Sequence, residues 1–123
     1  MDMLHLSQLE DLPWQPHPTI AGVLTKVFEG RAQNPSADAL LAQVVPQGAI
    51  PWHVHEQASE TAYLVAGKGT LLYAEDKEQM QTPLEAALTV GCAFTIRAGV
   101  WHSVLNRDAE PLILFAFHTP PTL

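Results

Sequence analysis

Hydrophobic residues from position 20 onward fall into short runs that are separated by polar and turn-forming residues. The runs are rich in Val, Ile, Leu, Tyr, Phe and Thr, and each is bounded by Gly, Pro, Asn or Asp, which is typical of short antiparallel strands. No ten-residue stretch has the periodicity of a helix. The predicted strands cover residues 20–29, 38–46, 51–56, 60–66, 69–75, 78–83, 86–90, 93–97, 102–106 and 111–118. The pattern therefore predicts an all-β fold, either a sandwich or a barrel.

Three short polar connections lie between these predicted strands, at residues 67–69, 75–77 and 106–108. Gly, Asn and Asp favour tight turns, so we expect each connection to join neighbouring strands as a hairpin. Residues 84–88 could form a single helical turn, but we favour a strand or a loop there because the surrounding pattern is all β.

Residues 1–19 have a different character from the rest of the chain. Three prolines occur within residues 13–18, and because proline fixes φ and lacks a backbone donor, this part predicts an extended arm. A short helix over residues 7–12 is an alternative within the arm, with a serine as N-cap and a glutamate three residues on. The arm packs either on its own barrel, which we favour, or on a neighbouring subunit. Residues 20–123 then form a single domain.

Composition narrows the classes of function. At 123 residues the chain has room for one compact domain, and 47% hydrophobic against 15% charged residues is enough apolar surface to build a core. The net charge of -7 and the lack of a Lys/Arg cluster make nucleic acid an unsuitable partner. The single cysteine, Cys92, allows no intramolecular disulfide. The first ten residues do not resemble a signal peptide, and the longest apolar run is far shorter than the ~20 residues of a membrane span, so we expect a cytoplasmic protein without a membrane anchor.

A His-x-His pair carries the first indication of chemistry. His53 and His55 lie two positions apart, so in an extended segment both imidazoles point to the same side and can share one metal ion. Glu60 opens the next predicted strand, and a turn would bring its carboxylate beside the pair. His102 follows far along the chain, and a closed sheet is needed to bring it to the same point. Spacing alone does not show whether Glu60 and His102 join the two histidines at one metal ion.

Two segments resemble the two sequence motifs of the cupin family. The first family motif is Gly, five residues, His-x-His, three or four residues, Glu, six residues, Gly. The second is Gly, five residues, Pro-x-Gly, two residues, His, three residues, Asn. The matching residues here are Gly48, His53, His55, Glu60 and Gly67, followed by Gly91, Arg97, Gly99, His102 and Asn106. The chain departs from the family in a gap before His53 that is one residue shorter and in Arg97, which stands where the family has proline.

The resemblance implies a jelly-roll barrel, also called a double-stranded β-helix, of six to eight strands with a metal in its interior. It further implies that His53, His55, Glu60 and His102 bind one divalent transition metal, with coordination positions left open for water, dioxygen or substrate. Imidazole and carboxylate ligands suit Fe, Mn, Ni, Cu or Zn. Open positions in a six-coordinate site favour Fe or Mn over a closed structural Zn site.

Four residues near the motifs are candidates for a substrate pocket. Ala62 and Leu64 share the strand parity of Glu60 and should line the barrel cavity. Trp52 and Trp101 each precede a ligand histidine, so strand alternation turns them away from the metal. Packing in the core or at the rim is the simpler interpretation of both tryptophans, and a substrate platform at the barrel mouth is the alternative.

His118 ends the last predicted strand and is the candidate catalytic residue. If Leu114 and Ala116 face inward, strand parity brings His118 to the cavity, where it could carry a proton near neutral pH. A histidine on the surface near the C-terminus is the simpler alternative.

These observations favour a metal-dependent enzyme that acts on a small metabolite, either with dioxygen or as an isomerase or lyase. The alternative is a non-catalytic module that binds a small ligand or stores a metal, because a fold does not fix a function. A transcription-factor sensor is disfavoured because no room remains for a helix-turn-helix. Exposed strand edges and the arm lead us to expect a homodimer.

Overall fold

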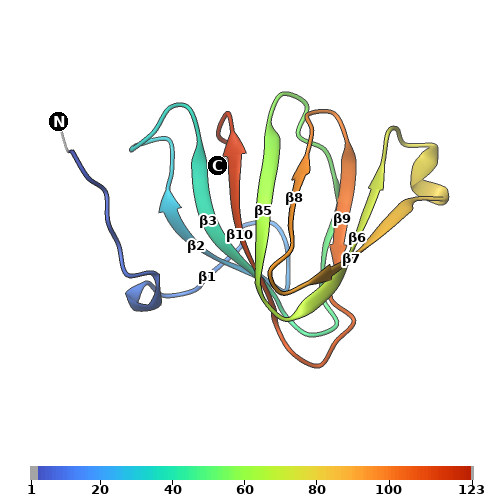
Figure 1. Ribbon diagram of the computed structural model, residues 1–123, viewed down its shortest axis with the longest axis horizontal. Helices are drawn as coiled ribbons and strands as arrows, with labels where there is room; N and C mark the ends of the chain where they lie inside the picture. The colour runs from blue at the N-terminus through green and yellow to red at the C-terminus, as the bar shows by residue number, and fades with distance from the viewer. Residues whose placement is uncertain (1–2, 123) are drawn as a thin grey trace.

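The computed structural model describes residues 3–122, which form two antiparallel sheets joined by short loops (Figure 1). The all-β prediction is confirmed. The strands are β1 Gln15–Pro16, β2 Val23–Glu29, β3 Asp38–Val44, β4 Ala49–His53, β5 Ser59–Ala66, β6 Lys68–Ala74, β7 Leu84–Thr89, β8 Ala93–Ile96, β9 Trp101–Leu105 and β10 Leu112–Thr119, with short 3-10 helices η1 Leu9–Asp11 and η2 Gln79–Gln81. Among the described residues no helix has the length and apolar character needed to cross a bilayer.

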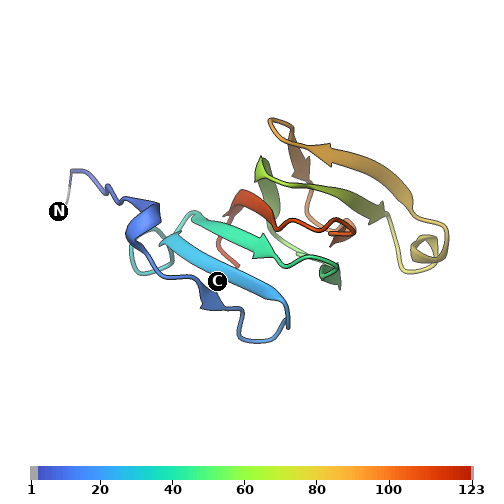
Figure 2. The same cartoon turned by 90° about the horizontal axis from the view of Figure 1, so that it is seen from below.

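The chain passes back and forth between the two sheets. One sheet has the strand order β1-β2-β3-β10-β5-β8, and the other has the order β4-β9-β6-β7. In Figure 1 the strands β2, β3, β10, β5 and β8 of the first sheet lie from the left to the centre, and β9, β6 and β7 of the second lie to the right; Figure 2 shows the same arrangement from below. Strands that are neighbours in space are therefore mostly distant in sequence, which is how residues of β4 and β9 come together.

The core lies between the layers and follows the period of two that strands impose. In β3 and in most of β10, buried and less buried positions alternate. Leu112, Leu114 and Ala116 face the core from β10, and His118 continues the same row at 7% exposure. Of the two orientations that parity left open for His118, the structure has the inward one.

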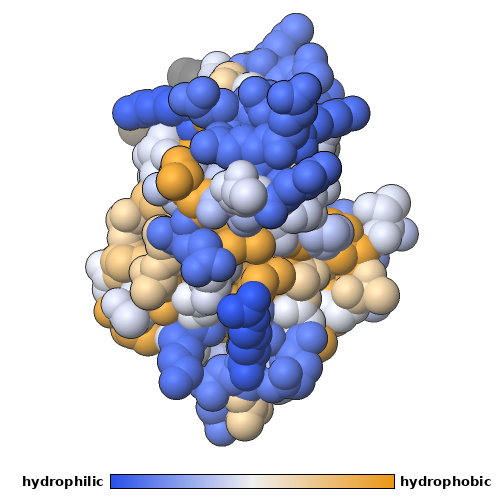
Figure 3. Space-filling model, turned by 90° about the vertical axis from the view of Figure 1, so that its right-hand side faces the viewer, coloured by the Kyte–Doolittle hydropathy of each residue, from blue (hydrophilic) through white to orange (hydrophobic). Residues whose placement is uncertain are grey.

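The surface of the six-stranded sheet that faces away from the core carries exposed apolar side chains. Tyr63, Val65 and Phe117 are each well exposed on β5 and β10. On the side of the molecule formed by β6, β7 and η2, a hydrophobic band crosses the middle of the surface between hydrophilic regions (Figure 3). The homodimer that would cover one such surface stays a prediction.

The strand predicted at residues 78–83 is wrong. This segment holds η2, because two side chains there offer the backbone alternatives to a sheet. The Gln79 amide donates to Asp76 Oδ1 at 2.9 Å, and Gln79 Oε1 accepts from the Glu75 amide at 2.7 Å. The next segment, for which a helical turn was the alternative, is the strand β7.

Two of the three predicted hairpins are also wrong. Residues 67–69 and 106–108 connect strands of different sheets, β5 to β6 and β9 to β10, so they are crossings between layers. Residues 75–77 do begin the connection between the paired strands β6 and β7. The crossing after β9 is held by Asn106, whose side-chain amide donates to three backbone carbonyls, including Glu110 O at 2.9 Å.

The N-terminal arm packs on its own chain from His5 onward, where the His5 ring stacks on Phe28. β1 pairs with β2, Lys26 Nζ donates to the Leu9 carbonyl at 2.9 Å, and the same ammonium lies 4.7 Å from the centre of the Trp14 ring. A 3-10 turn at Leu9–Asp11 replaces the helix considered for residues 7–12, and its cap position is Gln8. Residues 1 and 2 of the predicted arm and residue 123 of the predicted domain lie outside the described residues.

The crossing at Gly67 gives a stability prediction. Gly67 has φ +81°, and a Cβ placed there would lie 2.4 Å from the Pro111 carbonyl oxygen; Gly99 has φ +87° with no atom within 4 Å of that position. Both alanine variants should lose ~1–2 kcal/mol of the free energy of unfolding, because alanine disfavours the left-handed backbone conformation. We expect Gly67→Ala to lose roughly 1–3 kcal/mol more than Gly99→Ala because of overpacking. Urea unfolding of metal-free protein measures the difference, and equal losses would contradict the close approach.

Candidate metal centre

Four potential metal ligands meet where the two sheets face each other. His53 ends β4, His55 lies in the loop that follows, Glu60 is in β5 and His102 is in β9. His53 and His102 are direct partners in the β4–β9 pairing, which is how the sheet brings residues of two motifs together. One potential ligand atom from each of the four residues lies within 4.8 Å of the others. His55 is outside the strand predicted for it, and its carbonyl accepts from the Gly99 amide at 2.9 Å, which fixes its loop against the one before β9.

The backbone sets the tautomer of two of these histidines. His53 Nδ1 donates to the Pro51 carbonyl at 2.8 Å, and His102 Nδ1 donates to the Val100 carbonyl at 3.0 Å. A carbonyl oxygen only accepts, so each Nδ1 carries the proton and each Nε2 presents a lone pair. Such a hydrogen bond on the far nitrogen is the usual support of a metal-binding imidazole.

Two buried imidazole nitrogens in the cluster have no hydrogen-bond partner among the described residues. They are His55 Nε2 and His102 Nε2, which lie 3.3 and 3.6 Å from Glu60 Oε1 without hydrogen-bonding geometry. Buried polar atoms without partners are rare because they lose their hydration and gain no hydrogen bond in return. A metal ion among the four residues would satisfy both nitrogens, so the cluster fits a mononuclear metal site.

The charge states of the cluster also suit a metal. Burial, and then the nearby His102 imidazole, lowers the pKa of His53 to about 4, so this ring is neutral at pH 7. Burial alone would raise the pKa of Glu60, but the imidazoles around it, of which His118 donates a hydrogen bond at 3.0 Å, outweigh burial and hold that pKa well below 4.5. An ionised carboxylate beside imidazole nitrogens with free lone pairs is a donor set for divalent first-row transition metals.

His118 and Asp38 extend the site behind Glu60. His118 Nε2 lies 3.0 Å from Glu60 Oε1, and its Nδ1 lies 2.6 Å from Asp38 Oδ1. Burial opposes the charged ring, but these hydrogen bonds to Glu60 and Asp38 raise the pKa of His118 overall. The imidazolium thus bridges two carboxylates. Sequence reasoning missed Asp38. Asp38 lies two positions before Leu40, so in a strand it faces the same side as that core residue, and an acidic residue facing a core is a signal that could have found it.

A cavity of about 150 Å³ adjoins the cluster. The surface of its walls is mainly apolar, although half of the residues that line it are polar: His17, Ile20, Val23, Thr25, Leu40, Ala42, Ile50, His53, His55, Glu60, Leu114, Ala116, His118 and Thr122. His17, which comes from the arm, was also missed, because nothing in its sequence neighbourhood links it to the two motifs.

The four pocket residues predicted from the sequence do not line this cavity. Ala62 and Leu64 share the parity of Glu60, but they are almost fully buried in the hydrophobic core, farther along β5 from the cluster. Trp101 lies beneath Lys77, whose Nζ is 5.3 Å from the ring centre, and Trp52 is likewise absent from the lining. Parity gives the face of a strand and not the depth along it, so a role of these four residues in binding substrate stays a prediction.

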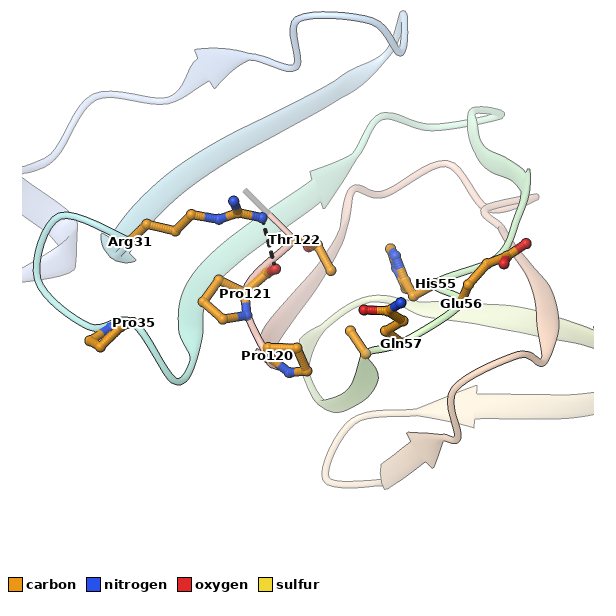
Figure 4. Close-up of a pocket in the computed structure, with 9 residues that line it drawn as sticks. Arg31, Pro35, His55, Glu56, Gln57, Pro120, Pro121 and Thr122 are labelled. Atoms are coloured by element: carbon orange, nitrogen blue, oxygen red, sulfur yellow. Dashed lines mark hydrogen bonds between the residues drawn. The ribbon is translucent and has the colours of Figure 1, made fainter.

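A second, outer pocket of about 540 Å³ lies beside the inner cavity (Figure 4). The two share His55 and Thr122 as lining residues. In the outer pocket the Arg31 guanidinium donates to the Pro121 carbonyl at 3.1 Å, which ties the loop after β2 to the C-terminal segment. His55 therefore stands between the inner cavity and the outer pocket.

Comparison with known proteins gives a consistent result. The family model described as "Cupin domain" matches residues 40–118, which include all four potential ligands. Germin-like protein 5-1 from Oryza sativa subsp. japonica is 31% identical over 80 residues, which make up 65% of this chain and 34% of that protein. The chain thus spans about a third of the length of this curated relative.

Solved structures resemble the fold closely at low sequence identity. A predicted oxalate decarboxylase from Thermotoga maritima superposes with a TM-score of 0.77 at 15% identity, covering 94% of this chain and 98% of that one. A recombinant oxalate oxidase in complex with glycolate gives a TM-score of 0.76 at 18% identity, covering 98% of this chain and 61% of that one. These likenesses establish the shared jelly-roll fold and confirm that prediction.

The bridging imidazolium makes a prediction about pH. The pKa of His118 in the fold lies above its ordinary 6.5, so its ion pairs stabilise the fold fully below pH 6.5 and lose effect as the pH rises through the folded-state pKa. In metal-free protein we expect His118→Gln to lower the free energy of unfolding by about 3 kcal/mol near pH 6 and by clearly less near pH 9.5. Urea unfolding at both pH values measures this.

His5→Gln is the matched control, because His5 pairs with Glu29 at the exposed surface. It should change stability little at either pH. A His118→Gln loss that is the same at both pH values would contradict the bridging imidazolium.

Proposed function

The chain belongs to the cupin family, and from that premise we propose that it is a metal-dependent enzyme acting on a small metabolite at one divalent transition metal. The proposed ligands are His53, His55, Glu60 and His102, with Fe or Mn as the favoured metals. The observation that carries the proposal is the pair of buried, unpartnered imidazole nitrogens beside a cavity. The reaction classes it suits are a dioxygenase-like oxidation and an isomerase or lyase step.

The residues of the chain have distinct roles in this proposal. A bound divalent metal would supply Lewis acidity and, if redox-active, a site for dioxygen. The His118–Asp38 pair holds the Glu60 carboxylate in place as a ligand. Apolar walls such as Leu114 and Ile50 keep water away from the reacting group, which strengthens electrostatic interactions there.

The cavity limits the substrate. A volume of about 150 Å³ is close to that of a cavity that accepts benzene, so the substrate is compact. No Lys or Arg is among the described residues that line it, so the body of the substrate is largely apolar and its polar group faces the metal. Two proteins of similar structure are named for oxalate, and one of them holds glycolate, so small carboxylic acids also belong in a screen.

One observation supports the non-catalytic alternative, a module that binds a small ligand or a metal. Both ring nitrogens of His118 are engaged by carboxylates, so the residue is not free to exchange a proton with a substrate. We therefore propose a positioning role for His118 in place of the proton carrier expected from the sequence. A binding module needs no such carrier, and a turnover assay separates the two functions.

Metal content tests the proposed site. We expect purified protein to carry about one transition metal per chain and the His55→Ala, His102→Ala double variant to carry almost none, because removal of two of four ligands leaves too few donors. Elemental analysis by mass spectrometry after gel filtration measures both.

His5→Ala is the matched control, since His5 lies outside the cluster, where its ring stacks on Phe28. It should retain the metal of the wild type. Equal occupancy in the wild type and the double variant would refute the ligand assignment.

Oxygen consumption tests the reaction class. With Fe(II)-loaded protein and a panel of catechols, enediols, thiols and small carboxylic acids, we expect at least one compound to drive oxygen uptake that the double variant does not support. Uptake would be followed with an oxygen electrode. If every compound is inert although the metal is bound, the result favours a lyase or a binding role over the dioxygenase-like reaction.

A further inference from the structure

His17 is a residue of the N-terminal arm that lines the cavity beside the metal cluster. It follows β1, and its backbone amide donates to the Val23 carbonyl at 2.8 Å, which fixes the turn against β2. Its side chain lines the inner cavity together with His53, His55 and Glu60. The family match begins at residue 40, so His17 lies outside the matched segment.

The hydrogen bonds of His17 determine which of its ring nitrogens carries the proton. His17 Nδ1 accepts from the backbone amides of Thr19 and Ile20, each at 3.1 Å. Backbone amides only donate, so Nδ1 must present a lone pair and the proton of the neutral ring resides on Nε2. Among the described residues none accepts a hydrogen bond from Nε2.

This tautomer is the opposite of that in two of the three proposed ligand histidines. His53 and His102 donate from Nδ1 to backbone carbonyls and present the lone pair of Nε2. His17 accepts at Nδ1 and presents an N–H at Nε2. It is therefore unsuited to bind the metal through Nε2 and suited to donate a hydrogen bond to a molecule in the cavity.

We infer that His17 is a specificity-determining residue that donates a hydrogen bond from Nε2 to the ligand bound at the metal centre. This inference rests on the proposed function, since it requires a metal at the cluster. It narrows the ligand class to compact molecules that carry lone pairs on two atoms. One of these atoms binds the metal, and the other accepts the hydrogen bond from His17. A molecule that turns an N–H toward His17 would leave two donors opposed, which disfavours it, whereas a hydroxyl oxygen can accept.

The test compares two probe ligands on cobalt-loaded protein. Azide binds a metal through one end and accepts a hydrogen bond at the other, whereas imidazole binds through one nitrogen and presents an N–H at the other. In His17→Asn the shorter side chain can still accept from the turn amides but does not reach the cavity. We expect this variant to bind azide roughly tenfold more weakly, because a hydrogen bond to a charged acceptor is lost. Imidazole affinity should not fall. Titrations followed by the visible cobalt spectrum measure both.

His17→Gln provides a rescue variant, because its longer side chain returns an N–H donor to the cavity, and it should recover part of the azide affinity. Equal azide affinity in the wild type and His17→Asn, with cobalt bound in both, would overturn the assignment of His17 alone. Equal weakening of azide and imidazole would also overturn it, because it would show a damaged cavity. If the wild type takes up no cobalt, the proposed function itself fails.

Discussion

The buried carboxylate of Glu60 is the constraint around which the site is built. An ionised carboxylate away from water is stable where charges or hydrogen-bond donors compensate it. Here His118 supplies the compensation, and Asp38 supplies the counterpart that keeps His118 charged. Sheet register sets this row, because His118 in β10 is paired with Asp38 of β3 on one side and with Glu60 of β5 on the other. A slip of one residue in either pairing would place the imidazole and that carboxylate on opposite faces of the sheet.

The second sheet completes the site from the opposite layer. His53 and His102 are register partners in β4 and β9, so the layers that close the barrel also bring their imidazoles to the carboxylate. Backbone carbonyls two residues before each histidine hold the lone pairs toward the centre. The fold thus controls where the imidazole nitrogens lie and also which nitrogen of each ring keeps a lone pair. His53 and His102 keep it on Nε2, whereas His17 keeps it on Nδ1.

Sequence reasoning reached the parts of the molecule that depend on local periodicity and on the spacing of the two motifs. The period of two predicted most of the strands and allowed two orientations for His118, of which the inward one is observed. The spacing of the motifs indicated that His102 lies near His53. It failed where side chains compete with the backbone, as at Gln79, and where a turn residue serves a crossing between layers, as at Gly67. It also missed Asp38 and His17, whose roles arise from partners distant in sequence.

The same architecture explains why the cavity is small and lies beside the metal cluster. Away from the cluster, Leu64, Val104 and Leu112 are almost fully buried and fill the space between the sheets. Near the cluster, the side chains from β3 and β10 that line the cavity include Ala42 and Ala116, and small residues leave room that larger ones would occupy. The apolar walls make desolvation of the polar cluster costly, and a bound metal would give the unpartnered imidazole nitrogens a partner. Stability and binding are therefore linked at this end of the barrel, because the groups that weaken the metal-free fold are the ones that would hold the metal.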